Sequence, residues 1–236
     1  MNLQKVTLKD IDKVSLAILP WGAIEPHNYH LPYYTDCILS QRVALEAVSL
    51  TGRADVAVFP PIFLGQQNPG QSEYPCCIHT RTETQKLILE DFVRSLSRQG
   101  INKLLIVNGH GGNSFKGLVR DLAFEYPDFK IYIADWFSIV GRTGYFEEEG
   151  DHADELETSV LMHYHPELVD LSVAGSGEAE SFAQKSLKEK TAWIPRNWRE
   201  TTQDTGIGNP HKSTAEKGER YSRAVISKLV QLINEL

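Results

Sequence analysis

Four short apolar runs, separated by longer segments of helical periodicity, most limit what this chain can fold into. Each run is rich in Val, Ile or Leu, which is typical of strands buried on both faces of a parallel sheet. Strands that alternate with helices predict right-handed crossovers, with helices on both faces of the sheet. The runs are SLAILP (15–20), DVAVFP (55–60), KLLIVNG (103–109) and KIYIADW (130–136). We therefore expect an α/β fold, a single three-layer domain over residues 1–236 with a mostly parallel sheet.

Residues that can cap helices stand before three of the periodic segments. TETQ at 82–85 matches a capping box, in which the Thr and Gln side chains satisfy free N–H groups at the start of a helix. Asn113 or Ser114 can cap a second helix, and Ser213 or Thr214 can cap a third. The expected helices are 86–100, which stops at Gly100, 115–126, which ends before Pro127, and a last one that runs toward Leu236.

Potential metal ligands follow two of the predicted strands. Glu25 and His27 come just after the first strand, and His110 lies in a Gly-rich turn just after the third. Parallel strands end at the same edge of a sheet, where α/β proteins bind their ligands, so both loops should open on one edge. Alternate side chains of an extended segment share a face, so Glu25 and His27 can point at the same ion. Asp36 is expected at the start of the next helix, where its carboxylate could bridge two ions.

A polar cluster next to apolar strands costs stability unless something satisfies it. Mixed His and carboxylate ligands favour zinc, manganese or iron over calcium. Two such ions about 3.5–4 Å apart can hold a hydroxide and polarise a carbonyl, which indicates a hydrolase. Taken singly, each of these residues is more often a capping, paired or surface group. Their convergence on one edge of the sheet is what favours the metal site.

The overall composition narrows the possible partners. The chain has 236 residues, 41% of them hydrophobic and 23% charged, as in one ordinary globular domain. With a net charge of −7 and no basic stripe, a nucleic-acid partner is not expected. No apolar stretch approaches the ~20 residues of a membrane span, the first residues lack a secretion signal, and the three cysteines form no CxxC pair. We expect a cytoplasmic protein that acts on a small molecule, without membrane or nucleic-acid partners.

Four sequence motifs follow one another in the same order as in a known family. Through these motifs, which are spread from residue 16 to about 220, the chain resembles the creatininase, or creatinine amidohydrolase, family. The four matches together are specific, whereas the Gly-rich turn alone would not be. The motifs are Glu25-Pro26-His27-Asn28-Tyr29-His30-Leu31-Pro32 followed by Asp36, NGHGGN at 108–113, HADELETS at 152–159, and the weaker GIGNP at 206–210 with EKG at 216–218.

The resemblance implies a set of functional residues. Family members are dinuclear metal-dependent amidohydrolases, and the resemblance assigns Glu25, His27, Asp36 and His110 as metal ligands, with Asp36 bridging. Two divalent ions would be bound, zinc in the first place and manganese or iron as alternatives. His152 matches a histidine that shuttles protons, for which an imidazole suits neutral pH. The family also implies a homo-oligomer, often of six subunits.

Other residues near these motifs have more than one interpretation. Asp151 could orient His152 or be a surface charge. His30 could bind substrate, support a metal ligand or pack in the core. Relatives that hydrolyse creatinine carry a glutamate two residues after the His of the Gly-rich turn, where this chain has Gly112. Glu157 is the candidate replacement ligand, although a Glu in the first turn of a helix often serves only the helix dipole or an ion pair.

Further departures from the family bear on the substrate. Asn28 stands where many relatives have Gly, so the turn must suit a residue that adopts left-handed geometry less freely. Cys76 and Cys77 stand in place of a Gly and a Thr, which predicts an altered pocket wall. Three tryptophans could form a flat wall for a ring substrate or be core or interface anchors: Trp136, Trp193 and Trp198.

These residues support a hydrolytic mechanism as a hypothesis. A hydroxide that bridges the two ions attacks the carbonyl of a small cyclic amide, and His152 passes a proton to the departing nitrogen. Alternatives within the family are a formamide deformylase and a ring-opening hydrolase of a cyclic polyol ketone. A metal-binding protein without catalytic activity is the alternative from another class. Gly112 and the altered cysteine segment argue against creatinine itself as the substrate.

Overall fold

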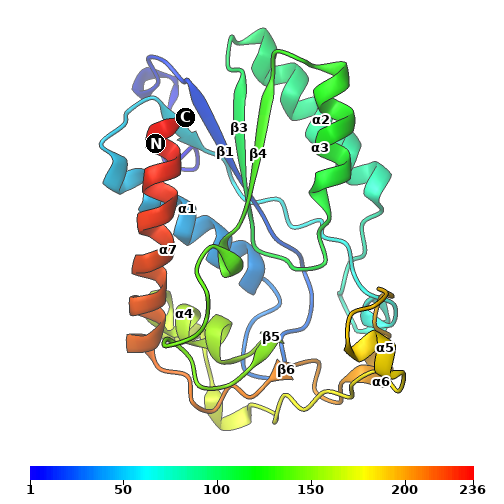
Figure 1. Ribbon diagram of the computed structural model, residues 1–236. Helices are drawn as coiled ribbons and strands as arrows, with labels where there is room; N and C mark the ends of the chain where they lie inside the picture. Colours follow the sequence, from blue (N-terminus) through cyan, green and yellow to red (C-terminus); the bar gives the residue numbers. More distant parts are fainter.

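The computed structural model describes residues 1–236, and a four-stranded sheet runs through its centre (Figure 1). The strand order is β2-β1-β3-β4, and every neighbouring pair is parallel. All four strands predicted from the apolar runs are confirmed, with small shifts at their ends. The strands are β1 (Leu16–Trp21), β2 (Val56–Val58), β3 (Lys103–Asn108) and β4 (Lys130–Asp135).

Successive residues of the strands point to opposite faces of the sheet and build two hydrophobic cores. Leu16 and Ile18 of β1 belong to the core under α1, α4 and α7, whereas Ala17 and Leu19 belong to the core under α2 and α3. The chain is therefore an α/β protein with helices on both faces of the sheet, as predicted. The helices are α1 (Thr35–Thr51), α2 (Thr82–Arg98), α3 (Phe115–Glu125), α4 (Glu155–Tyr164) and α7 (Ala215–Glu235).

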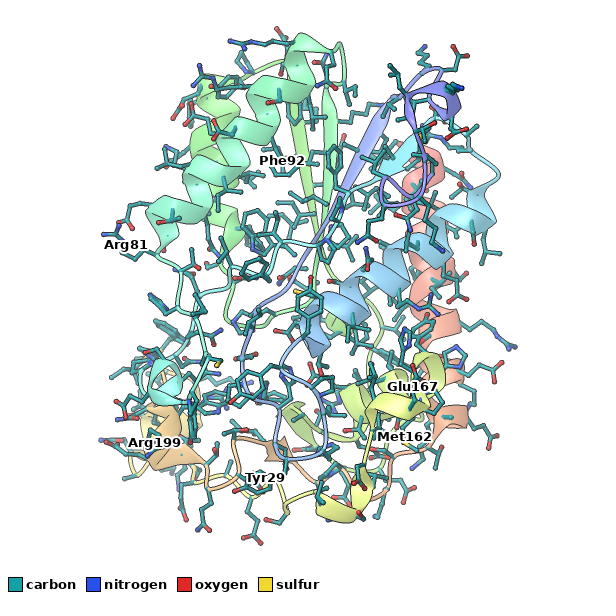
Figure 2. All side chains as sticks on the ribbon, turned by 180° about the vertical axis from the view of Figure 1, so that it is seen from behind. Tyr29, Arg81, Phe92, Met162, Glu167 and Arg199 are labelled. Carbon is teal, nitrogen blue, oxygen red and sulfur yellow. The ribbon has the colours of Figure 1, made fainter.

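The helix α2 illustrates how an amphipathic helix is held on the sheet. Figure 2 shows Phe92 between α2 and the strands, whereas Arg81, just before the first residue of the helix, extends outward. The Phe92 ring meets Phe59 edge-to-face, with 5.3 Å between the ring centroids. Leu89 and Val93 of the same helix are fully buried. Burial of this apolar face stabilises α2 on the sheet, and capping by residues at the ends of the helix does not.

The capping predictions were right for α7 and wrong for α2 and α3. Ser114 stands at the N-cap position of α3, but no side chain caps this helix. Thr214 caps α7, because its side chain accepts a hydrogen bond from the Lys217 N–H at 3.2 Å. The capping box at 82–85 is wrong, since α2 begins at Thr82 itself without a side-chain cap. Gln85 instead donates to the Leu64 carbonyl oxygen at 2.9 Å. A contact between distant segments has replaced the local one that the motif predicted.

A small two-stranded sheet lies beyond the carboxyl end of the main sheet. The strand β5 pairs antiparallel with β6, and Figure 1 shows both at the end of the molecule opposite the two termini. No helix is both long enough and apolar enough to cross a membrane. The short elements are η1 (Leu8–Asp10), η2 (Gln71–Glu73), η3 (Trp136–Ser138), β5 (Gly150–His152), η4 (Pro166–Leu168), η5 (Leu171–Val173), α5 (Lys185–Lys188), α6 (Trp198–Thr201) and β6 (Ile207–Gly208).

The loops after β1 and β3 open on the same edge of the sheet, as predicted. The two strands are direct neighbours, and Trp21 at the end of β1 lies beside Asn108 at the end of β3. The segment 172–212 packs on the loop after β1, since the Thr205 hydroxyl accepts a hydrogen bond from the Asn28 N–H at 2.8 Å. The loops that carry the predicted ligands therefore lie between the sheet and this segment.

Candidate metal centre

Six residues that the sequence motifs single out meet in one buried cluster at the carboxyl edge of the sheet. Each of them exposes at most 9% of its surface. The loop after β1, the first turn of α1, the turn after β3, the strand β5 and the first turn of α4 supply them. The residues are Glu25, His27, Asp36, His110, His152 and Glu157.

Two glycines explain how Asp36 comes so close to both strands. Gly22 follows β1 and Gly109 follows β3, and both lie against the first turn of α1. A Cβ atom on Gly22 would lie 2.6 Å from the Cys37 nitrogen, and one on Gly109 would lie 2.4 Å from the Asp36 carbonyl oxygen. Only residues without a side chain allow this approach. The helix therefore begins directly against the sheet edge, with Asp36 facing the neighbouring ligands.

Backbone carbonyls orient the imidazole rings of His27 and His110. The Nδ1 atom of His27 lies 3.0 Å from the Glu25 carbonyl oxygen, and the Nε2 atom of His110 lies 2.5 Å from the Gln66 carbonyl oxygen. Carbonyl oxygens only accept, so these outer ring nitrogens carry the N–H. The inner nitrogens, His27 Nε2 and His110 Nδ1, face the carboxylates. Metal-binding histidines are commonly fixed in this way.

The carboxylate of Asp36 lies between these two imidazoles. Its Oδ1 atom is 3.0 Å from His27 Nε2, and its Oδ2 atom is 3.2 Å from His110 Nδ1. The second contact lies outside hydrogen-bond geometry, so buried Oδ2 has no hydrogen-bond partner. The Oε1 atom of Glu25 is 2.9 Å from the same His110 nitrogen. A buried carboxylate oxygen without a hydrogen-bond partner lowers the stability of the folded protein. A cation bound at this position would satisfy it.

The donor atoms form overlapping groups of three, each within 4.8 Å of one another. One group consists of Glu25, Asp36 and His110, and another of His27, Asp36 and Glu157. Asp36 is the only residue common to these two groups, so its two oxygens could serve two different ions. Glu157 lies in a group with His27 and Asp36, and it stays the candidate for the ligand that is missing at Gly112.

The electrostatics of the cluster also fit divalent cations. Burial, together with the charge of Asp36, raises the pKa of Glu157 to about 8. Burial opposes a charge on His27, but the nearby carboxylates, Asp36 first, raise its pKa to about 10. Without metal, protons therefore balance part of the buried negative charge. Three carboxylates and two imidazoles are a donor set that suits divalent cations.

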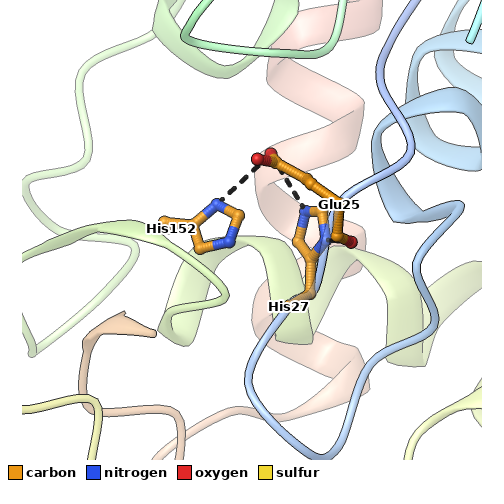
Figure 3. A group of neighbouring side chains, drawn as sticks. All are labelled: Glu25, His27 and His152. Atoms are coloured by element: carbon orange, nitrogen blue, oxygen red, sulfur yellow. Dashed lines mark hydrogen bonds and ion pairs between the residues drawn. The ribbon is translucent and has the colours of Figure 1, made fainter. Parts of the chain in front are cut away.

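His152 belongs to a third group of donor atoms, with Glu25 and His27, but to neither of the two groups that contain Asp36. Figure 3 shows its ring next to Glu25 and His27, with dashed lines from Glu25 to both imidazoles. Its Nδ1 atom is 3.6 Å from Glu25 Oε1, and its ring centroid is 4.3 Å from that of His27. Its Nε2 atom lies 2.9 Å from the Pro26 carbonyl oxygen, so Nε2 carries the N–H and Nδ1 is a free base in the neutral ring. Burial lowers the pKa of His152.

Asp151 does not join the cluster and does not contact His152. Its carboxylate is 52% exposed and lies 3.0 Å from Arg196 Nη1. Neighbouring residues of an extended segment point in opposite directions, so an inward His152 sends Asp151 outward. The expectation that Asp151 orients His152 is therefore corrected, because the Pro26 carbonyl does so. Trp198 adds a second constraint, with its ring 5.2 Å from that of His152 and edge-on.

Other residues that the sequence singled out lie around the cluster in different roles. His30 is buried, and its Nε2 atom lies 2.8 Å from the Thr158 hydroxyl, next to Glu157 in the chain. Asn28 has a φ of 54°, the left-handed geometry that its place in the turn requires. Trp136 is buried in the core, whereas Trp193 is 84% exposed. Of the three tryptophans, Trp198 is the one that contacts a residue of the cluster.

Sequence reasoning missed the groups that orient the ligands. Gln71 donates from Nε2 to Glu25 Oε2 at 2.5 Å, and both side chains are buried. Gln66 and Pro26 act through their backbone carbonyls, which no side-chain motif reveals. Gln71 is the first residue of the short helix η2 and lies 46 residues from its partner in the chain, so no local pattern could have identified it. The proline could have been noticed, because it lies inside the first motif.

A parallel α/β sheet with buried His and carboxylate donors at its carboxyl edge defines a class of protein, the metal-dependent hydrolases. The family profile of creatininase, described as creatinine amidohydrolase, matches residues 1–233. The chain belongs to the creatininase family and is a hydrolase of that family.

Individual relatives support this assignment. The mycofactocin precursor peptide peptidase of Mycobacterium ulcerans (strain Agy99) is 31% identical over 226 residues, which cover 92% of this chain and 83% of the peptidase. A proposed creatinine amidohydrolase from Bacteroides fragilis NCTC 9343 has 56% identity and a TM-score of 0.97, over 99% of this chain and 95% of that one. The manganese form of a creatininase, at 21% identity, has a TM-score of 0.81 over 99% and 97% of the two chains, and shares the fold.

Proposed function

We propose that this protein is a dinuclear metal-dependent amidohydrolase. Glu25, Asp36 and His110 would hold one divalent ion, His27, Asp36 and Glu157 would hold the other, and Asp36 would bridge them. The observation that carries the proposal is that two buried donor groups share Asp36 alone, whose two oxygens face different imidazoles. Zinc fits the mixed donor set best, and the manganese form of a structural relative supports manganese as the alternative.

When bound, two such ions would polarise an amide carbonyl and lower the pKa of a coordinated water. The chain's own residues then hold the reacting groups in place. His27 and His110 keep their inner nitrogens directed into the cluster, where they would hold the ions, because backbone carbonyls accept their outer N–H groups. His152 offers Nδ1 to take up a proton and return it to the departing nitrogen, while Pro26 holds Nε2–H. These are the roles of a general base and acid in amide hydrolysis.

The proposed substrate is a small amide, with a cyclic amide as the first candidate. A formamide or a cyclic polyol ketone would use the same polarised carbonyl and remains in the set to be tested. The similarity to a mycofactocin precursor peptide peptidase adds a peptide bond to this set. We further propose that the protein acts in the cytoplasm as a homo-oligomer, with six subunits as the number to test by gel filtration with light scattering.

A metal-controlled activity screen tests the proposed function. Purified protein stripped of metal would receive zinc, manganese or iron and then each substrate class. Hydrolysis should require metal, and Asp36→Ala should lose both metal uptake and turnover, because it removes the shared ligand. Asp121→Ala, an exposed aspartate of α3, is the matched control and should keep both. Two bound ions with no turnover on any class would instead favour a non-catalytic metal-binding protein, and full activity of Asp36→Ala would defeat the bridging role.

A further inference from the structure

Gln71 lies outside all four sequence motifs, but its side chain contacts the candidate metal centre. Its Nε2 atom donates to Glu25 Oε2 at 2.5 Å, and its side chain is 1% exposed. The other carboxylate oxygen, Oε1, faces the histidines: His110 Nδ1 is 2.9 Å away, and His152 Nδ1 is 3.6 Å away. The carboxylate of Glu25 is therefore divided, with one oxygen held by an amide and the other directed into the cluster.

A second hydrogen bond fixes which way round the Gln71 amide lies. Its Oε1 atom accepts a hydrogen bond from the Asn68 N–H at 2.7 Å. A backbone N–H can only donate and a carboxylate can only accept, so a single orientation of the amide satisfies both partners. A flipped amide would place the Gln71 side-chain oxygen against the Glu25 carboxylate oxygen. The Gln71 NH2 group therefore has to face Glu25.

The loop that carries Gln71 is itself pinned against the segment that contacts His152. The Pro69 carbonyl oxygen accepts a hydrogen bond from the Trp198 N–H at 2.8 Å. Gly70, with a φ of 84°, packs so closely that a Cβ atom there would lie 2.6 Å from Asn197 Oδ1. These contacts hold the backbone just before Gln71 against the segment 197–198. The Gln71 amide is thus a buried part of the site, with both its polar atoms hydrogen-bonded.

We propose that Gln71 is a positioning residue that makes Glu25 a ligand through Oε1 alone. By occupying Oε2, it prevents the carboxylate from turning away from the ion shared with Asp36 and His110. Because the amide is neutral, it orients the carboxylate without reducing the negative charge that attracts the cations. The inference rests on the proposed dinuclear site. It assigns to Gln71 control over one of the two ions, since His27 and Glu157 lie in the other group.

The test is the zinc affinity of each site in Gln71→Met, measured by titrating metal-free protein against a chromophoric chelator. Methionine keeps the length of the side chain and removes the donor. Loss of an outer hydrogen-bond partner commonly weakens metal binding about 10–100-fold, and we expect that loss at one site only, with the other unchanged. Gln71→Glu sets a carboxylate against Glu25 and should weaken the same site further than methionine does.

Gln67→Met is the matched control, because Gln67 lies in the same loop, is 8% exposed and has no hydrogen-bond partner for its side-chain amide. It should bind both ions as the parent protein does. Parent-like affinity of Gln71→Met or Gln71→Glu would overturn the role of Gln71, and so would an equal loss at both sites, which indicates a general support of the fold. A parent protein that binds fewer than two ions would overturn the dinuclear site itself. The two failures are therefore distinguishable.

Discussion

At the scale of single residues, Gly112 leaves no room for a side chain in the turn after β3. A Cβ atom on Gly112 would lie 2.2 Å from the Gln66 carbonyl oxygen and 2.4 Å from His110 Nε2. Those two atoms form the hydrogen bond that orients His110. Any side chain at 112 would break it. Glu157 enters the cluster from the other side, where its Oε2 atom accepts a hydrogen bond from the Ala153 N–H at 2.5 Å.

We predict that Gly112→Ala weakens metal binding at least about tenfold, because the new methyl group displaces His110 or the Gln66 carbonyl. Gly111→Ala is the matched control, since a Cβ atom on Gly111 meets nothing within 4 Å, and it should bind metal normally. Chelator competition on the two purified variants measures the difference. Equal affinities would mean that the loop yields freely and that the hydrogen bond to Gln66 is dispensable.

At the scale of elements, the pair α4 and α7 determines whether Glu157 reaches its partners. Gly218 of α7 lies against α4, and a Cβ atom there would be 1.9 Å from the Ser159 carbonyl oxygen. Ser159 is two residues after Glu157 on the same helix. The Asp154 side chain fixes the other end of this turn, because it accepts hydrogen bonds from the N–H groups of Leu156 and Glu157. The position of Glu157 therefore depends on how closely these two helices pack.

We predict that Gly218→Ala destabilises the protein by ~1–3 kcal/mol, the usual effect of overpacking. It should also lower the metal affinity of the proposed site that includes Glu157. The matched control is Gly117→Ala in α3, where a Cβ atom meets nothing within 4 Å. That substitution should stabilise the protein by up to ~1 kcal/mol through helix propensity. Urea unfolding with metal and without it compares the two variants. A Gly218→Ala variant as stable as the parent would show that α7 can shift without effect.

At the scale of the whole molecule, metal binding should be linked to stability. The proposed ligands come from loops and helix starts on both halves of the chain, and they bring three buried carboxylates together. Only the folded chain can assemble such a site, so ions that bind it favour the folded state.

We predict that removal of both metal ions with EDTA lowers the melting temperature by roughly 10–20 °C. At free metal about 100-fold above the dissociation constant, each of the two proposed sites contributes about 2.7 kcal/mol, and each kcal/mol shifts a protein of this size by about 2–4 °C. Differential scanning calorimetry of metal-loaded and metal-free protein measures the shift. Asp36→Asn, which lacks the shared charge, should melt at the same temperature with and without EDTA, and a parent that behaves likewise would contradict the linkage.

The sequence by itself determined where the strands lie, that they run parallel, and at which edge of the sheet the proposed ligands meet. These follow from short apolar runs and from residues placed just after them, such as Glu25, His27 and His110, because backbone propensity and alternation act over a few residues. The family motifs added His152 and Glu157 as candidates. They could not tell whether Glu157 reaches His27, since that distance depends on the packing of α4.

Only the tertiary structure decided which groups orient the ligands. It brought Gln71 to Glu25, gave His152 the Pro26 carbonyl instead of Asp151, and replaced the capping box of α2 with contacts to a distant loop. Each of these contacts joins segments whose separation is set by how helices and loops pack on the sheet. Packing is a property of the whole chain, so no local pattern contains it.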